Sequence, residues 1–434
     1  MTDVFLCSSF NIIEVFYGNK TVHFFLSLPG KPPSLKYRYL YQIHLKKNSF
    51  RNHPDLENHS ADIIIIGGGL AGLVSAIHLS KSGLSVMLIE RNEYPKHKVC
   101  GEYISNEVLP YLQSLGADPM TTGAKKISRF LLSTTRGKVI ETKLPLGGFG
   151  VSRYTLDHFL VQNAIKNNAA VICDTVSDVH FENDSFKVIT KAGKELSSKI
   201  VIGAFGKRSN MDITLNRAFI KNRSPFVGVK THMQGDFPED LVALHNFDGG
   251  YCGVSQVENG NLNVCYLANY KSFQQYKNID AFNQAVLYKN PHLKNIFENA
   301  VPVFEEPLAI SQICFADKTT VQDHILMCGD AAGMIHPLCG NGMAMAIHSA
   351  KIASELIIDY SNKKIRSRQE LESLYNRQWN YEFKKRIQTG RILQSFFGKD
   401  NLARAIMYGL THVPGILPAI IKQTHGKLLN VSVV

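Results

Sequence analysis

The sequence predicts an α/β protein made of a Rossmann-like domain, an antiparallel β-sheet domain and a helical C-terminal region. Three observations predict this fold. A glycine-rich strand–turn–helix–strand pattern begins at residue 61, and four short apolar runs separated by Gly, Asn, Asp and Pro follow between residues 226 and 270. After a second buried strand at residues 324–330, the chain ends in long stretches with helical spacing. A chain of 434 residues has room for about two or three such units.

These patterns divide the chain into five segments. Residues 61–225 and 306–360 are expected to be two parts of the Rossmann-like domain, residues 226–305 the antiparallel-sheet substrate domain, and residues 361–434 the helical C-terminal region. Residues 1–60 show neither helical nor strand periodicity and are interpreted as a poorly ordered extension. An alternative is that the natural protein begins near Ser60, so the presence of this segment in the natural protein is left open.

The overall charge of +12 is concentrated at the chain ends, which argues against a nucleic-acid surface on one folded face. No apolar run approaches the ~18–20 residues that span a bilayer, and no secretory signal is recognisable. The eight cysteines contain no C-x-x-C pair and no dense cluster. They indicate reduced thiols in a cytoplasmic protein, and no metal site is expected.

The glycine pattern at the start of the Rossmann-like domain predicts a phosphate-binding loop. Gly67 permits a tight turn, Gly69 lets the backbone approach a pyrophosphate, and Gly72 lets the helix pack on the strand. Glu90 ends the second strand, near the spacing of about 20 residues expected for a carboxylate that accepts hydrogen bonds from ribose hydroxyls. An acidic residue there favours FAD or NAD(H) over NADP(H). The predicted site also includes Leu70, Ala71 and Arg91.

A second motif, at residues 324–350, decides between these cofactors. A buried strand ends at Asp330, and a Gly340-Asn341-Gly342 turn opens another helix. Asp330 is placed to accept hydrogen bonds from a polyol, and the helix start presents N–H groups to an electron-rich ring edge. This arrangement suits the ribityl chain and isoalloxazine of FAD. The alternative is an N-capping Asp followed by an unrelated tight turn.

At these residues the sequence resembles the family of FAD-dependent oxidoreductases that includes para-hydroxybenzoate hydroxylase, flavin-dependent halogenases and geranylgeranyl reductases. The resemblance rests on GGGLAG…E, GDAAG…P…GNG, SRYTLDHFL and GAFGKRS, and it covers most of residues 61–360. It implies a Rossmann-like FAD-binding domain of the glutathione-reductase type. It also implies that Arg153 lies near the cofactor and that the backbone at Thr175 and Val176 touches adenine.

The segment 91–116 resembles a loop of the reductases, halogenases and related monooxygenases, which implies that Cys100-Gly101-Glu102 passes beside the isoalloxazine. The alternative is a buried Cys and a solvent-facing Glu. Two departures are clear. The single tryptophan, Trp379, excludes the halogenase tryptophan motif, and GGYCGVSQV at 249–257 replaces the aromatic strand typical of geranylgeranyl reductases. Phe205-Gly206 replaces the Asp-Gly pair with which the hydroxylases handle NADPH.

The resemblance implies a monooxygenase-type oxidoreductase acting on a hydrophobic aromatic, polyketide or isoprenoid-like small molecule, with NAD(P)H as electron donor. A reductase of prenyl double bonds is the alternative, and a flavin-bound scaffold or sensor is a third, non-enzymatic one. The sequence assigns no catalytic residue and no oligomeric state. Four residues are candidates for the wall of the substrate cavity: Tyr251, Cys252, His336 and Cys339.

The C-terminal residues 380–434 interleave basic and apolar side chains. Amphipathic helices of a folded enzyme usually face its core, so we expect these helices to cap the flavin domain. Peripheral contact with an anionic membrane surface is the alternative that the same pattern leaves open.

Overall fold

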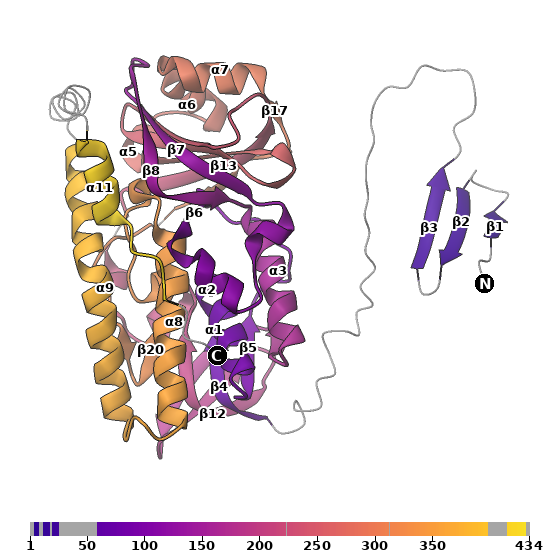
Figure 1. The fold of residues 1–434 in the computed structure, drawn as a ribbon, viewed down its shortest axis with the longest axis vertical. Coiled ribbons are helices and arrows are strands. Elements are labelled where there is room, and N and C mark those ends of the chain that lie inside the picture. Colours follow the sequence, from indigo (N-terminus) through magenta and orange to yellow (C-terminus); the bar gives the residue numbers. More distant parts are fainter. Residues whose placement is uncertain are drawn as a thin grey trace. The chain divides into compact units, whose positions relative to one another are not determined.

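The computed structural model (Figure 1) describes residues 4–7, 12–17, 20–25, 59–222, 224–311, 313–397 and 415–430, in two units, residues 1–51 and 52–434. In the first unit, three strands form an antiparallel sheet: β1 (Val4–Cys7), β2 (Ile12–Tyr17) and β3 (Lys20–Phe25). The sequence pattern gave no indication of these strands. Most of the remaining residues up to 60 lie outside the described residues, so their interpretation as an extension stays a prediction.

The first sheet of the second unit carries the predicted Rossmann-like pattern. Its eight strands run in the order β10-β11-β12-β4-β5-β9, with β20 beside β12 and β19 beside β20. Five of them are parallel: β4 (Ser60–Ile66), β5 (Val86–Glu90), β9 (Ala170–Cys173), β12 (Glu195–Gly203) and β20 (Ile325–Met327). Three are antiparallel to their neighbours: β10 (Val176–Glu182), β11 (Ser185–Thr190) and β19 (Val321–Gln322). The buried run Ile63–Ile66 occupies β4, as predicted.

Helices pack against this parallel sheet and against one another. Helix α1 (Leu70–Lys81) contacts both α3 (Arg153–Lys166) and α8 (Gly342–Ser361). Leu73, Ile77 and Ile347 in these helices are completely buried. Because parallel strands end at one edge of the sheet, the turns that open α1 and α8 lie at the carboxyl ends of β4 and β20, where ligands bind in such sheets.

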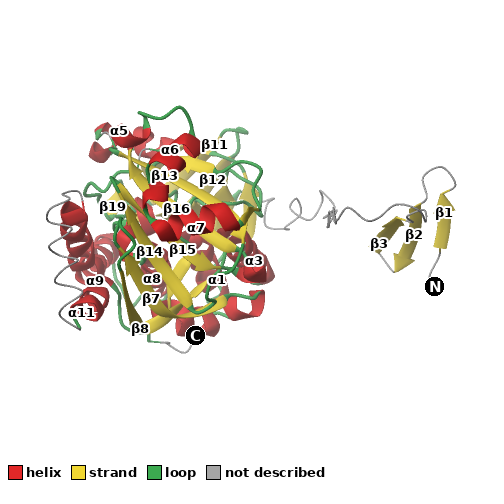
Figure 2. Ribbon diagram, turned by 90° about the horizontal axis from the view of Figure 1, so that it is seen from above, coloured by secondary structure: helices red, strands yellow, loops and turns green. Residues whose placement is uncertain are grey.

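The second sheet is mainly antiparallel and has nine strands, in the order β17-β13-β16-β15-β14-β7-β8-β6 with β18 beside β13 (Figure 2). Its strands are β6 (Tyr103–Ser105), β7 (Lys125–Ser133), β8 (Val139–Gly150), β13 (Phe226–Gln234), β14 (Leu241–Phe247), β15 (Gly250–Gln256), β16 (Leu262–Asn269), β17 (Val301–Pro302) and β18 (Leu308–Ile310). The predicted β7–β8 hairpin is present. However, β6–β8 lie within the segment 61–225 that we assigned to the Rossmann-like domain, and they join this sheet through a parallel pairing of β7 with β14.

The two faces of this sheet have different neighbours, because alternate side chains of a strand point to opposite faces. Val227, Val229 and Cys252 pack with residues of three helices in one apolar cluster. These helices are α5 (Tyr270–Phe273), α6 (Ile279–Ala285) and α7 (Pro291–Asn299). Gly228 lies between the two valines and Tyr251 precedes Cys252, so both point to the other face, where they line a cavity.

The helical C-terminal region contains α9 (Arg368–Phe397) and α11 (Ile416–Thr424). Helix α9 packs on α8 through buried Tyr375, Trp379 and Phe383. Within the described part of the chain, no helix is long and apolar enough to cross a membrane. Helix α9 covers the flavin domain as expected, but Leu417 and Ile421 of α11 are buried against the second sheet instead. Membrane contact through this region stays a prediction.

Two further short helices connect these elements, α2 (Leu109–Ser114) and α4 (Asn210–Thr214). Neither carries a predicted site residue.

Candidate active site

A cavity of about 760 Å³ is lined by both sheets and by the helices beside them. Its wall brings together residues that the sequence placed at one site although they are up to 275 positions apart, from Gly67 to Gly342. The predicted site residues in the wall are Gly67, Gly69, Leu70, Ala71, Glu90, Arg91, Arg153, Val176, Asp330, Gly340, Asn341 and Gly342. Gly72, which was predicted together with them, does not line the cavity.

The glycine loop explains why Gly72 lies behind the wall. A Cβ atom at Gly72 would lie 2.0 Å from the carbonyl oxygen of Gly67, so this position permits close packing of α1 on the loop. Gly67 has φ +105°, a left-handed conformation that favours glycine. A Cβ at Gly69, in contrast, would meet only the Arg153 guanidinium, at 3.9 Å. The backbone at Gly69 is therefore open toward the cavity, as an approaching pyrophosphate requires.

Glu90 fixes the same loop from the end of β5. One carboxylate oxygen accepts from the Gly68 N–H at 2.7 Å, and the other accepts from the backbone and side chain of Asn92 at 3.0 and 2.7 Å. A carboxylate has about four lone-pair sites, so three donors leave room for about one more. Tyr94 donates to the Gly68 carbonyl at 2.6 Å. The loop is therefore held in place by protein contacts, with acceptor capacity remaining on Glu90.

Asp330 and the Gly340–Gly342 turn lie in the same wall. Burial raises the pKa of Asp330, and the positive charges of Lys318, Arg153 and Lys207 oppose this shift. Helix α8 begins at Gly342, and its N-cap residue Asn341 makes no side-chain capping bond. The Oδ1 atom of Asn341 is buried without a hydrogen-bond partner among the described residues. These groups offer an acceptor carboxylate and free backbone donors at one end of the cavity.

Arg153 is held at the cavity by a buried ion pair. Its guanidinium donates to both oxygens of Asp157, at 2.7 and 2.8 Å, and Lys98 donates to Asp157 at 2.8 Å. Burial alone would raise the pKa of Asp157, but the charges of Arg153 and Lys98 outweigh burial and lower it. Two cations thus share one carboxylate, which leaves positive potential on the cavity side of this group.

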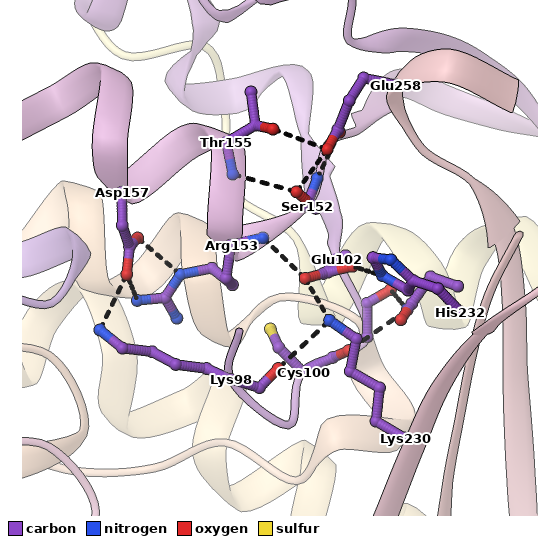
Figure 3. Close-up of polar contacts among 12 residues, drawn as sticks. Lys98, Cys100, Glu102, Ser152, Arg153, Thr155, Asp157, Lys230, His232 and Glu258 are labelled. Carbon is purple, nitrogen blue, oxygen red and sulfur yellow. Dashed lines mark hydrogen bonds and ion pairs between the residues drawn. The ribbon is translucent and has the colours of Figure 1, made fainter. Parts of the chain in front are cut away.

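The loop between Lys98 and Tyr103 passes along the cavity, and Cys100 and Gly101 line it as the resemblance implied. Glu102 instead points into the protein and is completely buried, with φ +53°. Its carboxylate accepts from Lys230, from His232 at 2.7 Å and from the Arg153 backbone N–H at 2.6 Å (Figure 3). The alternative of a solvent-facing Glu is therefore wrong.

Lys230 and His232 hold the Glu102 loop in place, and the sequence analysis missed them. They occupy alternate positions of β13 with Gly228, which lines the cavity. Polar residues at this spacing in an otherwise apolar strand indicate a buried polar group on one face, and this pattern is visible in FVGVKTHM.

The other half of the cavity is apolar. Its wall residues belong to one hydrophobic cluster built from the second sheet and from α11: Phe130, Leu132, Leu144, Val242, Leu244, Tyr251, Leu267, Leu417, Ile420 and Ile421. Of the four candidate wall residues, Tyr251 and Cys339 line the cavity. Cys252 does not, because it faces α6 and α7 on the opposite side of β15. His336 does not line the cavity either, because its ring packs against Phe226, Tyr251 and Phe315.

The residues present fit FAD. The open backbone at Gly69 and the uncapped start of α1 suit a pyrophosphate, and Glu90 retains acceptor capacity for a ribose. Asp330 and the start of α8 suit the ribityl chain and the ring. No group of three or more His, Cys, Asp or Glu side chains within the described ranges could hold a metal ion.

Comparisons with known proteins agree with this fit. The family model described as "FAD binding domain" matches residues 60–363. A digeranylgeranylglycerophospholipid reductase of Methanococcus vannielii is 25% identical over 340 residues, which cover 75% of this chain and 84% of that protein. Conditioned medium factor receptor 1 of Dictyostelium discoideum is 24% identical over 377 residues, covering 74% and 68%. The flavin-dependent brominase Bmp2 has a similar fold, with a TM-score of 0.70, 18% identity and coverage of 84% and 93%.

Proposed function

We propose that this protein, which belongs to the FAD-binding domain family and is an FAD-dependent oxidoreductase, reduces carbon–carbon double bonds of an apolar, isoprenoid-like substrate. The observation that carries the proposal is the apolar half of the cavity, which continues from the residues that fit the flavin. Several relatives at 24–26% identity are named as digeranylgeranylglycerophospholipid reductases. Their names support reduction of the substrate over its oxygenation.

When bound, the flavin supplies the hydride for such a reaction. The protein must hold the chain beside the cofactor and exclude water, and the aliphatic wall of the second sheet and α11 suits both tasks. Cys265 also lines the cavity, and burial raises its pKa to about 12. Its thiol is therefore neutral at pH 7 and adds no charge to the cavity wall.

Monooxygenation of a hydrophobic substrate is the second candidate. The observation that favours it is strand β15, where the sequence departs from the reductase pattern and where Tyr251 and Gly253 form part of the cavity wall. The departure thus falls on the surface that the substrate would contact. In both candidates we propose NAD(P)H as the source of electrons.

The two reactions leave different marks on the product. The FAD-loaded protein is incubated with NADPH or NADH and geranylgeraniol under ¹⁸O₂, and the recovered lipid is analysed by mass spectrometry. The proposal predicts addition of two hydrogen atoms for each reduced double bond and no heavy oxygen. One ¹⁸O atom in the product would instead support monooxygenation. Recovery of unchanged alcohol while NAD(P)H reduces the flavin would contradict both reactions for this substrate class.

A further inference from the structure

Helix α11 supplies one side of the apolar half of the cavity. Leu417, Ile420 and Ile421 recur at the three- and four-residue spacing of one helical face, and all three line the cavity. Leu417 and Ile421 are buried with Leu132, Leu144 and Leu244 of the second sheet, and Ile420 packs against the same cluster. Ala419, on the opposite face, is exposed and does not line the cavity.

The last turn of α11 and the residues that follow it are tied to the flavin end of the site and to buried Glu107. The Asn341 side chain donates to the Thr424 carbonyl at 2.8 Å, and Asn341 belongs to the turn that opens α8. Glu107 is completely buried, and its carboxylate accepts from the backbone N–H of Gly426 and from Arg386. The Leu429 N–H also donates to the Glu107 carbonyl, at 2.8 Å.

This anchoring leaves little freedom for the C-terminal end of α11. A Cβ atom at Gly426 would lie 2.6 Å from the Arg386 guanidinium and 2.7 Å from the Glu107 carboxylate, so the chain passes this point in close contact. Two buried polar side chains, one of them in the predicted flavin-binding turn, therefore hold α11 beside the sheet. A wall held in this way has a defined separation from the strands opposite it.

We infer that α11 is the specificity-determining wall of the substrate site, and that Leu417 and Ile420 limit the length of the apolar chain that the cavity accepts. The inference rests on the proposed function for the class of ligand, an uncharged isoprenoid-like chain. Its physical basis is that an overfilled apolar slot forces side chains out of their preferred conformations, whereas an enlarged one accepts additional methylene groups.

The test measures binding and not turnover. Equilibrium dialysis gives the dissociation constants of radiolabelled geraniol, farnesol and geranylgeraniol for the FAD-loaded wild-type protein and for Ile420→Trp. We expect Ile420→Trp to weaken binding of geranylgeraniol by about tenfold or more and binding of geraniol much less. Ala419→Trp is the control, since it adds the same side chain to the exposed face of the same helix. It should leave all three constants unchanged.

A second variant covers the case in which Ile420→Trp loses FAD or fails to fold. Ile420→Ala should keep FAD and shift the preference toward the longest alcohol. Equal length preference in the wild type, Ile420→Trp and Ile420→Ala would overturn the role of α11 while leaving the proposed function intact. Failure of all three alcohols to bind the wild-type protein would contradict the proposed substrate class, and the inference with it.

Discussion

The ammonium group of Lys230 donates to the carboxylate of Glu102, and neither side chain is exposed to solvent. The second oxygen of Glu102 accepts from His232, and the Arg153 backbone N–H donates to the same oxygen as Lys230. The pair joins the loop that carries Cys100 and Gly101 to strand β13 of the second sheet. One wall of the cavity is therefore held in place by a buried network in which the Glu102 carboxylate and the Lys230 ammonium group compensate each other's charge.

Replacement of Glu102 by Gln should destabilise the protein strongly. Removal of one partner leaves the Lys230 charge buried without its counter-ion, which typically costs about 3–5 kcal/mol. Urea unfolding measures the loss. The matched control is Glu239→Gln, which breaks an exposed pair with Lys125 and should cost about 0–1 kcal/mol. The double variant Glu102→Gln/Lys230→Met should recover part of the stability, and equal losses for Glu102→Gln and its control would contradict the network.

The same carboxylate predicts a pH dependence. Burial alone would raise the pKa of Glu102, but the His232 hydrogen bond and the Lys230 charge outweigh it, so the folded-state pKa is lowered. Its contribution to stability is therefore present above the unfolded-state pKa of about 4.3 and is lost as pH falls through the folded value. Urea midpoints of the wild type and Glu102→Gln should converge as the pH is lowered below about 4.3. A constant difference down to the acid transition would count against a charged Glu102.

Two glycines of one loop should respond differently to the same substitution. Gly69→Val should fold but bind FAD poorly, because the new side chain occupies space that the protein leaves open at the cavity. Gly72→Val should lower stability even without FAD, because its Cβ would lie 2.0 Å from the Gly67 carbonyl oxygen. Bound FAD per chain and the thermal unfolding of the FAD-free proteins separate the two effects. Full FAD loading of Gly69→Val would show that the pyrophosphate does not approach there.

Asp330→Ala should weaken FAD binding with little loss of folding stability. The variant removes an acceptor in the cavity wall, and a hydrogen bond to a charged group contributes about 1.5–3 kcal/mol. Titration of the FAD-free protein with FAD, followed by quenching of flavin fluorescence, gives the change in affinity. A variant purified yellow and fully loaded, with wild-type affinity, would rule out the assignment of Asp330 to the ribityl chain.

The sequence predicted the glycine loop and the flavin end because each is built from consecutive residues whose conformation is local. The spacing of Gly67, Gly69 and Gly72 predicts a strand–turn–helix unit from local sequence alone. The Glu102 network has no such signature, since Lys230 and Glu102 are 128 positions apart. Only the tertiary pairing of β13 with the sheet brings them together.

The boundary of the second sheet was missed for a related reason. Strands β7 and β8 form a hairpin, and sequence patterns can predict a hairpin. They do not indicate which sheet the hairpin joins. The parallel pairing of Arg129–Ser133 with Leu241–His245 joins segments more than 100 residues apart. In the same way, the sequence indicated apolar residues in α11 but not that they border the cavity.

Anaerobic reoxidation of the bound flavin tests the proposed reduction of double bonds directly. The FAD-loaded protein is reduced with dithionite, excess reductant is removed, and geranylgeraniol is added in the absence of oxygen while flavin absorbance is recorded. We predict that the oxidised spectrum returns and that one double bond is saturated for each flavin reoxidised, because the apolar chain lies beside the cofactor and accepts its hydride. Flavin that stays reduced with the alcohol bound, and reoxidises only when oxygen is admitted, would contradict the proposed reduction.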